Sequence, residues 1–423
     1  MAAYRRQVDK WTNAAVHDGV DSFDELIVFL PGVYPPVVAE SLTRLLNAGV
    51  LTRPQVRRVT RRLDKSQVRM SKPPEQVLPA PHPLDYDWRY SLAAIEILLE
   101  QVLDVTKPGD TIALLGTPSL YVVTRRGNFD RNFVLVDGSV TTVDGLRQPG
   151  SGRTLYRRDF FTDHVPDLDA AAVVADPPWY DEYIAAFLWA AASCARSEAT
   201  VLISLPAVGT RPGSWSERKQ FRATAASHSL ILTDTLSHHL AYLSPPFEVN
   251  ALAAAGWTGL PVDWRRGDLA ILRVAGQAGA RPTRSQKPPR WEERTIGRVR
   301  IRIRDTSAAQ PVDPRLQTIV ANDVLDDVSR RHPLRDRPNV WTSGNRVYYC
   351  ASPRLLLLVL DALSSGSDPV RCVASKIGRE PTRAEDLNIS RSASQLRWIG
   401  RIEGRELARS GWISQPTREK TAS

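Results

Sequence analysis

Short apolar runs alternate with helix-like segments between residues 111 and 276, and this alternation constrains the fold more than any other feature. Glycine, aspartate or proline bounds most of the runs, and several of the segments between them have the spacing of amphipathic helices. Strands that are separated by helices usually pair in parallel, with helices on both faces of the sheet. The sequence therefore predicts an α/β domain around a mostly parallel sheet. Its seven expected strands are residues 111–116, 132–138, 153–160, 171–176, 200–206, 230–236 and 269–276.

Ligands of such sheets bind at the carboxyl ends of the strands, where the first four expected strands place Gly116, Asp137, Asp159 and Asp176. The first of these loops, "GTPSL", has one glycine and lacks the G-x-G fingerprint that NAD or FAD requires. A nucleoside without phosphates demands less of this loop. Asp137 follows the first strand by about twenty residues, the spacing at which an acid holds a ribose hydroxyl. Asp137 and Gly138 could instead only form a turn, and Asp159 could pair with a neighbouring arginine.

The stretch "VVADPPWYDEY", residues 173–183, ends the fourth expected strand in an unusual way. Pro177 and Pro178 cannot donate backbone hydrogen bonds, so they stop the strand and hold a stiff, extended path. Asp176 precedes this pair, and the aromatic residues Trp179 and Tyr180 follow it. Asp-Pro also commonly opens a turn before a helix, and the two aromatic side chains could simply pack against that helix.

The region from about residue 85 to 278 resembles the class I S-adenosylmethionine-dependent methyltransferases, which have a Rossmann-like sheet. "DPPW" resembles the [D/N]-P-P-[F/Y/W] motif of the members that methylate exocyclic amino groups of adenine or cytosine. The resemblance implies that Asp176 and the carbonyl of Pro177 accept hydrogen bonds from the amine, that Pro178 stiffens the segment, and that Trp179 stacks on the base.

The same resemblance implies where S-adenosylmethionine binds. Gly116 matches the glycine of the first loop, Asp137 the acid that binds the ribose, and Asp159 the acid near the adenine. "GTPSL" departs from the family's glycine-rich loop. Tyr180 joins Trp179 as an expected contact of the substrate.

Three functions are compatible with these residues. The first is methyl transfer to an amino group of a DNA or RNA base. The second is aminopropyl transfer, since branched-polyamine synthases also place a winged-helix domain before a Rossmann-like domain with a D-P-P segment. Their first loop carries acids for a cationic substrate, however, where this chain has Gly116, Thr117, Pro118 and Ser119. The third is a methyltransferase fold that has lost catalysis and binds nucleic acid as a scaffold.

Composition changes on both sides of this region and predicts three domains. Residues 1–75 form a helical, winged-helix-like module, residues 76–279 the Rossmann-like domain, and residues 280–423 a linker with a small basic α+β domain. In the first module, Arg53, Arg57, Arg58, Arg61 and Arg62 either contact phosphates or form a solvated basic face. In the last, "GRVRIRIRD" predicts a strand with a solvent-facing basic side, which either follows a nucleic-acid backbone or protects a sheet edge.

The formal net charge of +10 favours an anionic partner such as nucleic acid and disfavours a polycation. Cys194, Cys350 and Cys372 have no spacing typical of a disulfide framework or a metal site, and we expect no metal. The adjacent His238 and His239 also lack metal-site spacing, and we expect them in a loop. We expect a cytoplasmic protein without a membrane partner, because no apolar run is long enough to span a bilayer. The sequence predicts no oligomeric state.

Overall fold

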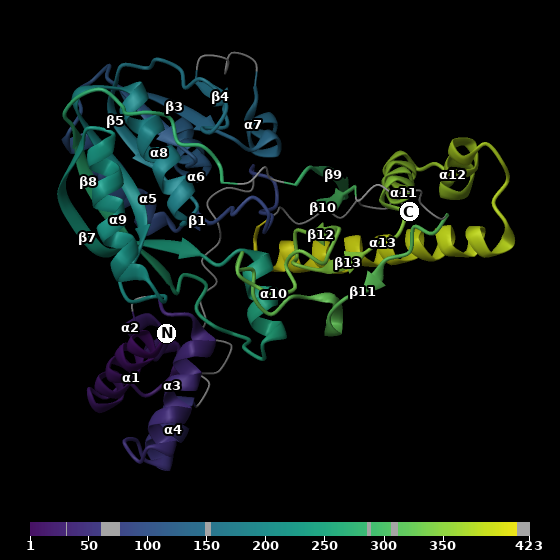
Figure 1. Ribbon diagram of the computed structural model, residues 1–423, viewed down its shortest axis with the longest axis horizontal. Coiled ribbons are helices and arrows are strands. Elements are labelled where there is room, and N and C mark those ends of the chain that lie inside the picture. The colour runs from purple at the N-terminus through teal and green to yellow at the C-terminus, as the bar shows by residue number, and fades with distance from the viewer. Residues whose placement is uncertain (31, 61–76, 149–153, 286–288, 306–311, 413–423) are drawn as a thin grey trace, which may run out of the picture. The chain divides into compact units, whose positions relative to one another are not determined.

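The computed structural model describes residues 1–423 except 31, 61–76, 149–153, 286–288, 306–311 and 413–423. Contacts within the chain group its residues into two compact units (Figure 1). Unit 1 comprises residues 1–78, 88–244 and 259–286, and unit 2 comprises residues 79–87, 245–258 and 287–423. The helices near the N-terminus thus belong to the same unit as the large sheet, and two short segments from earlier in the chain join the C-terminal residues. The three-domain division therefore stays a prediction.

The secondary structure of unit 1 begins with helices and continues as alternating strands and helices. Its elements are α1 (Ala2–His17), α2 (Phe23–Phe29), α3 (Pro35–Asn47), α4 (Arg53–Thr60), β1 (Arg89–Tyr90), α5 (Leu92–Asp104), β2 (Thr111–Leu115), α6 (Pro118–Arg126), β3 (Asn132–Asp137), α7 (Val140–Leu146), β4 (Leu155–Arg157), β5 (Ala170–Ala175), α8 (Asp181–Cys194), β6 (Ala195–Pro206), α9 (Ser214–Ser227), β7 (Leu230–Leu243) and β8 (Arg265–Val274).

The sheet of unit 1 has eight strands in the order β1-β7-β8-β6-β5-β2-β3-β4. Strands β2 to β6 pair in parallel, whereas β8 runs antiparallel to both β6 and β7. The mostly parallel sheet is consistent with the expected Rossmann-like methyltransferase fold. The expected count of seven strands was wrong by one, because the two-residue strand β1 adds to the edge by pairing with the end of β7. Two residues are too short to produce an apolar pattern.

Helices cover both faces of this sheet because alternate strand residues point to opposite sides. On one face, Val173 and Ile203 pack with residues of α8 and α9. On the other, Leu114 and Val174 pack with residues of α5, α6 and α7. All six residues of β5 are buried, which explains its uninterrupted run of alanine and valine.

The N-terminal helices pack on the same unit. The hydroxyl of Tyr4 in α1 donates to the carbonyl of Thr210 at 2.8 Å, and the ring of Trp11 lies against Gly209. Residues 1–60, apart from residue 31, contain helices and no strand, so the winged-helix module stays a prediction. Of the arginines predicted to bind phosphate, Arg61 and Arg62 lie outside the described residues, and Arg58 donates to the carbonyl of Val16.

Unit 2 consists of an antiparallel five-stranded sheet in the order β11-β13-β12-β10-β9, with helices (Figure 1). Strands β12 and β13 form an antiparallel pair, and helix α11 follows them. The elements of the unit are α10 (Pro246–Ala254), β9 (Trp291–Ile296), β10 (Val299–Arg304), β11 (Gln317–Thr318), a 3-10 turn (Ala321–Asp323), β12 (Val340–Thr342), β13 (Val347–Tyr349), α11 (Pro353–Ser365), α12 (Pro369–Ile377) and α13 (Arg383–Arg409).

The expectation of a solvent-facing basic strand in unit 2 was wrong. β10 lies inside the sheet, between β12 and β9. Its Arg300 is 2% exposed, donates to the carbonyl of Ala80 and pairs with Asp85 and Glu293. Burial alone would raise the pKa of Glu293, yet the arginine contacts lower that pKa to about 2. The alternating arginines of β10 are therefore structural ion-pair partners.

Candidate functional site

The carboxyl ends of β2 and β5 meet at the centre of the sheet and bring the first loop against the "DPPW" segment. Leu115 pairs with Ala175, and the backbone N–H of Asp176 donates to the carbonyl of Leu115 at 3.0 Å. Gly116 has a positive φ of 64°. A Cβ atom there would lie 2.9 Å from the Phe187 ring and 3.3 Å from the Asp176 carbonyl oxygen. Glycine is therefore required for both conformation and space.

The Asp176 carboxylate lies among hydroxyl groups from two other strands, β6 and β7, which are separated in the sheet by β8. Ser204 in β6 and Tyr242 in β7 both donate to its Oδ1 atom, the latter at 2.7 Å. Burial and then the Asp176 charge raise the pKa values of Tyr90 and Tyr242 well above the ordinary value, so both phenols stay protonated. Asp176 itself is only partly buried, which leaves its carboxylate within reach of a ligand. The arrangement fixes the orientation of an acceptor for hydrogen bonds.

The Trp179 ring forms an aromatic wall beside this carboxylate. Its Nε1 donates to Ser204 at 3.4 Å, and its ring meets the Tyr242 ring edge to face, with centroids 5.4 Å apart. Tyr90 lies on the other side of Tyr242, at a centroid distance of 4.9 Å. Tyr180 precedes α8 as its N-cap residue, so the turn-before-helix interpretation of "DPPW" also describes the local structure.

The carbonyls that follow the Asp-Pro step have donors of their own. The carbonyl of Pro178 accepts from the N–H of Tyr180, and the carbonyl of Trp179 accepts from Arg211, each at 2.7 Å. These two contacts hold the end of the Pro-Pro segment in place. The remaining carbonyl, that of Pro177, is the one that the resemblance assigns to the amine.

Two arginines accompany the aromatic wall. The guanidinium of Arg265 lies 3.8 Å from the ring centroid of Trp88 and 6.0 Å from that of Trp179. Arg211 holds the Trp179 carbonyl and pairs with Glu217 at 2.8 Å. Arg265 therefore places a positive charge beside the Trp179 ring, while the charge of Arg211 is paired with that of Glu217.

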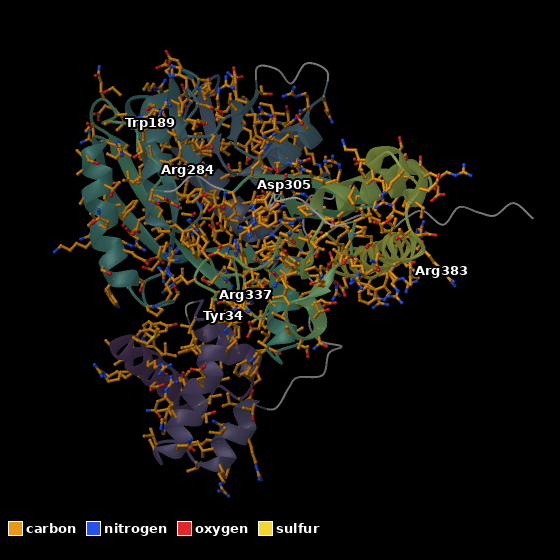
Figure 2. The ribbon with its side chains drawn as sticks, turned by 45° about the vertical axis from the view of Figure 1, so that its right-hand side comes forward. Tyr34, Trp189, Arg284, Asp305, Arg337 and Arg383 are labelled. Carbon is orange, nitrogen blue, oxygen red and sulfur yellow. The ribbon has the colours of Figure 1, made fainter. Side chains whose placement is uncertain are left out.

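Asp137 and Asp159 differ in their surroundings. Asp137 ends β3, is 9% exposed and accepts a hydrogen bond from the N–H of Ser139 at 2.7 Å. This hydrogen bond forms the short turn that was one of the two alternatives for Asp137 in the sequence. Asp159 is bound by Arg284 at 2.9 Å (Arg284 is labelled in Figure 2). The sequence suggested that Asp159 could pair with an arginine next to it in the chain. The arginine that binds it, Arg284, instead lies far along the chain. The expected linker residues 280–285 thus pack on unit 1.

The first loop also contains Thr117, which is 1% exposed. Its Oγ1 atom has no hydrogen-bond partner among the residues that the structure describes. His238 and His239 were expected in a loop, but they lie within β7 where its pairing with β8 is irregular. His238 has a φ of 59°, and its N–H donates to buried Asp268.

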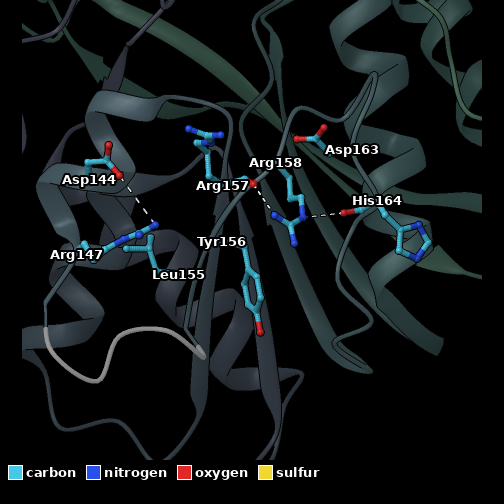
Figure 3. A pocket seen from close by; sticks show the side chains of 8 residues that line it. All are labelled: Asp144, Arg147, Leu155, Tyr156, Arg157, Arg158, Asp163 and His164. Carbon is cyan, nitrogen blue, oxygen red and sulfur yellow. Dashed lines mark hydrogen bonds and ion pairs between the residues drawn. The ribbon is translucent and has the colours of Figure 1, made fainter.

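A pocket of about 690 Å³ opens between α7 and β4 (Figure 3). Arg158 lies within it, donating from Nε to the carbonyl of His164 at 3.0 Å. The predicted cofactor residues and Asp176 are not among its lining residues. The residues that line the pocket are Asp144, Arg147, Leu155, Tyr156, Arg157, Arg158, Asp163 and His164.

Sequence reasoning missed Ser204, Tyr242, Tyr90, Arg211 and Arg265 around Asp176. Ser204 gave one signal, since it is a polar residue within the apolar run "VLISLP". Tyr242 lies beyond the expected end of its strand, because β7 continues to Leu243.

No protein-family model matches the chain, and no curated protein matches it. Among solved structures, it is similar to the branched-chain polyamine synthase C9 mutein from Thermus thermophilus in complex with N4-aminopropylspermidine and 5'-methylthioadenosine. That match has 11% identity and a TM-score of 0.48, and it covers 68% of this chain and 94% of the synthase. A TehB-like SAM-dependent methyltransferase from Corynebacterium glutamicum matches with 11% identity and a TM-score of 0.29, covering 43% of this chain and 88% of the other.

Crossing a bilayer requires a helix of sufficient length and hydropathy, a requirement that applies to each helix of the described residues. None of these helices is both long and apolar enough to cross one.

Proposed function

We propose that unit 1 is an S-adenosylmethionine-dependent methyltransferase that acts on an exocyclic amino group of a nucleic-acid base. The observation that carries the proposal is the setting of Asp176. Its partly exposed carboxylate is held by Ser204 and Tyr242 at the carboxyl end of a central strand, beside the Trp179 ring. A hydrogen-bond acceptor next to a flat aromatic ring fits a planar amine.

The residues of the first loops fit the nucleoside part of the cofactor. Asp137 can accept hydrogen bonds from ribose hydroxyls at the end of β3, and Gly116 allows close approach of the backbone. The orphaned hydroxyl of Thr117 offers a further donor in the same loop. Asp159 fits less well, because its carboxylate is bound by Arg284. When bound, the cofactor supplies a methyl group whose bond to sulfur breaks, with its electron pair left on sulfur, as the amine nitrogen bonds the carbon and releases a proton.

Asp176 would orient the acceptor. An amine conjugated to a base is a poor nucleophile, so its position and direction govern the rate. The Asp176 carboxylate and the carbonyl of Pro177 would each accept an N–H bond and favour the positive charge that develops on nitrogen. Trp179 would hold the base by stacking, which is worth about 1–3 kcal/mol per base, once the base is single-stranded or flipped out.

The arginine beside the Trp179 ring favours an anionic acceptor. Arg265 lies 6.0 Å from the Trp179 ring and would repel a polyamine, which carries several positive charges, whereas Arg211 beside it is paired with Glu217. Arg265 would instead attract the phosphates that flank a base in nucleic acid. This is the reason for preferring methyl transfer to a base over aminopropyl transfer.

The test combines cofactor binding with transfer. Calorimetric titration with S-adenosylmethionine should show saturable heat. Methyl-labelled cofactor should then label single-stranded DNA or RNA, while an aminopropyl donor with a polyamine should give no product. Asp176→Asn should abolish transfer and leave cofactor affinity within about twofold, because Asp176 faces the acceptor. The exposed Asp234 provides a matched control, Asp234→Asn, which should transfer at the normal rate.

Trp179 tests the acceptor side separately. Trp179→Ala should weaken acceptor binding by about 1–3 kcal/mol, and Trp179→Phe should retain most of it because a flat ring remains. Trp215, which is 68% exposed on α9, gives the control Trp215→Ala. If the protein shows no saturable heat at millimolar cofactor, the methyltransferase proposal is refuted. The alternative of a non-catalytic nucleic-acid-binding scaffold then stands. Wild-type transfer rates in folded Asp176→Asn would refute the role of that carboxylate.

A further inference from the structure

The longest helix of unit 2 is α13 (Figure 1). It carries a stripe of exposed arginines that the site in unit 1 does not use. Among the described residues, no hydrogen bond or ion pair engages the side chains of these arginines. The stripe, called here the arginine face, consists of Arg383, Arg391, Arg397, Arg401, Arg405 and Arg409.

We propose that the arginine face binds the phosphate backbone of double-stranded DNA. The proposal deepens the proposed function, since it rests on the choice of nucleic acid as partner and names the polymer form and the surface that holds it.

Helix geometry places all six arginines on one side. With about 100° between successive residues, they fall within an arc of about 120°. Arg397, Arg401 and Arg405 follow each other at intervals of four residues, one above the other. From Arg383, labelled in Figure 2, to Arg409 the helix rises about 39 Å, at about 1.5 Å per residue. That length matches about one turn of B-DNA, whose helical repeat is about 34–36 Å.

Of the four acidic residues of α13, exposed Asp386 borders the stripe and accepts from the Ser390 hydroxyl, whereas the other three lie away from it and have donors. Glu385 pairs with Arg379 at 2.7 Å, and Glu406 pairs with Arg346 at 3.2 Å. Glu403 is 1% exposed and accepts from the N–H of Gly344 at 2.9 Å. Asp386 is thus the one acid of α13 at the edge of the arginine face, and six arginines against one carboxylate leave a net positive charge there.

The opposite side of α13 fixes the helix to its unit. Ile389, Leu396 and Ile399 are fully buried there, and Gly400 is required because a Cβ would lie 2.6 Å from the Ile296 side chain. The arginine face is thus presented by a rigid element whose core-facing side is already occupied.

Charge and shape together favour duplex DNA. The major groove is about 12 Å wide and admits an α-helix, with long side chains reaching the phosphates on either side. Between the arginines lie exposed Ser390 and Ser394 together with Leu387 and Trp398, which are 50% and 40% exposed. The deep, narrow major groove of duplex RNA would not admit the helix.

The test uses the full-length chain without cofactor and a 20-base-pair DNA duplex labelled for fluorescence anisotropy, titrated between 50 and 200 mM salt. The variant replaces four of the arginines: Arg391→Gln, Arg397→Gln, Arg401→Gln and Arg405→Gln. The matched control removes the same charge elsewhere on unit 2: Arg290→Gln, Arg298→Gln, Arg337→Gln and Arg371→Gln. All eight side chains are exposed, so both variants should melt like the wild type.

We expect the variant to lose more than tenfold in affinity at 100 mM salt, and its slope of log affinity against log salt to flatten by about 0.9 per lost phosphate contact. The control variant should retain most of the wild-type affinity and most of the wild-type salt slope. Equal losses in the two variants, or an unchanged slope in the first, would overturn the proposal. So would a wild-type preference for single-stranded DNA, duplex RNA, anionic vesicles or acidic peptide over the duplex.

Binding is measured here without S-adenosylmethionine, so failure of the two proposals can be told apart. If the chain fails to bind cofactor but binds duplex DNA through α13, the methyltransferase proposal is refuted and the DNA-binding role of the arginine face stands. If the chain binds no duplex DNA and methylates a short single-stranded acceptor equally well with and without the four arginines, the methyltransferase proposal stands. The DNA-binding role of the arginine face is then refuted.

Discussion

The hydroxyl of Tyr242 tests whether the site around Asp176 is built as described. Tyr242→Phe removes one oxygen atom, which donates to Asp176 Oδ1 at 2.7 Å. The ring itself should stay in place, because it is 2% exposed and packs against Trp179 and Tyr90. The substitution therefore isolates one hydrogen bond to a carboxylate.

The size of the effect follows from the charge on the acceptor. A hydrogen bond to a charged group contributes about 1.5–3 kcal/mol, and Ser204 remains as the second donor to the same oxygen. A loss of that size should lower the melting temperature by roughly 2–4 °C per kcal/mol for a unit of about 250 residues. If the carboxylate also loses its orientation, kcat/KM for methyl transfer should fall about 10- to 100-fold. Cofactor affinity should change less than twofold.

Tyr121 offers a matched control in the same unit. Its hydroxyl is hydrogen-bonded to Thr154 Oγ1 at 3.0 Å, its side chain is 1% exposed, and its partner is neutral. Tyr121→Phe should lower the unfolding free energy by about 0.5–1.5 kcal/mol and leave transfer unchanged. The assay is a melting curve with steady-state kinetics for all three proteins. An unaltered kcat/KM in Tyr242→Phe, or an equal loss in Tyr121→Phe, would refute the role given to this hydroxyl.

Three further predictions follow from other contacts. Asp137→Ala should raise the dissociation constant for S-adenosylmethionine about tenfold or more. Asp159→Ala should change that constant less than threefold, because Arg284 already binds the Asp159 carboxylate. Calorimetry in which Asp159→Ala weakens binding more than Asp137→Ala would contradict this assignment. Gly116→Ala should destabilise unit 1 by about 1–3 kcal/mol through its positive φ and its contact with Phe187, and a melting temperature equal to the wild type would show that the loop can move. Burial raises the pKa of Glu403 from its usual 4.5 to about 7, so its stabilising neutral form is lost as pH rises through 7. The unfolding free energy of unit 2 should therefore fall between about pH 4.5 and 7, by roughly 1.4 kcal/mol per pH unit, and this fall should be absent in Glu403→Gln.

The sheet could be predicted from the sequence because buried parallel strands leave long apolar runs. Asp176 could likewise be placed at a strand end, since Pro177 and Pro178 must stop the strand. The partners of Asp176 could not be predicted, because they depend on how far β7 extends and on which strands become neighbours. Ser204 and Tyr242 lie 28 and 66 residues from Asp176 along the chain, and only the strand order brings them together.

Two arginine-rich segments of unit 2 show why charge in the sequence does not identify a binding surface by itself. The arginines of β10 alternate with apolar residues, which suggests a basic face, yet Arg300 and Arg302 share the carboxylates of Asp85 and Glu293. Burial would be costly for these charges without such partners, so the strand can lie inside the sheet only because acids from elsewhere in the unit reach it. Helix α13 has six arginines against three in β10, and of its four acids only exposed Asp386 borders them, because the others pair with Arg379 and Arg346 or turn inward. Its arginines therefore remain solvated and available, and an anionic partner is the group that can pair with all of them at once.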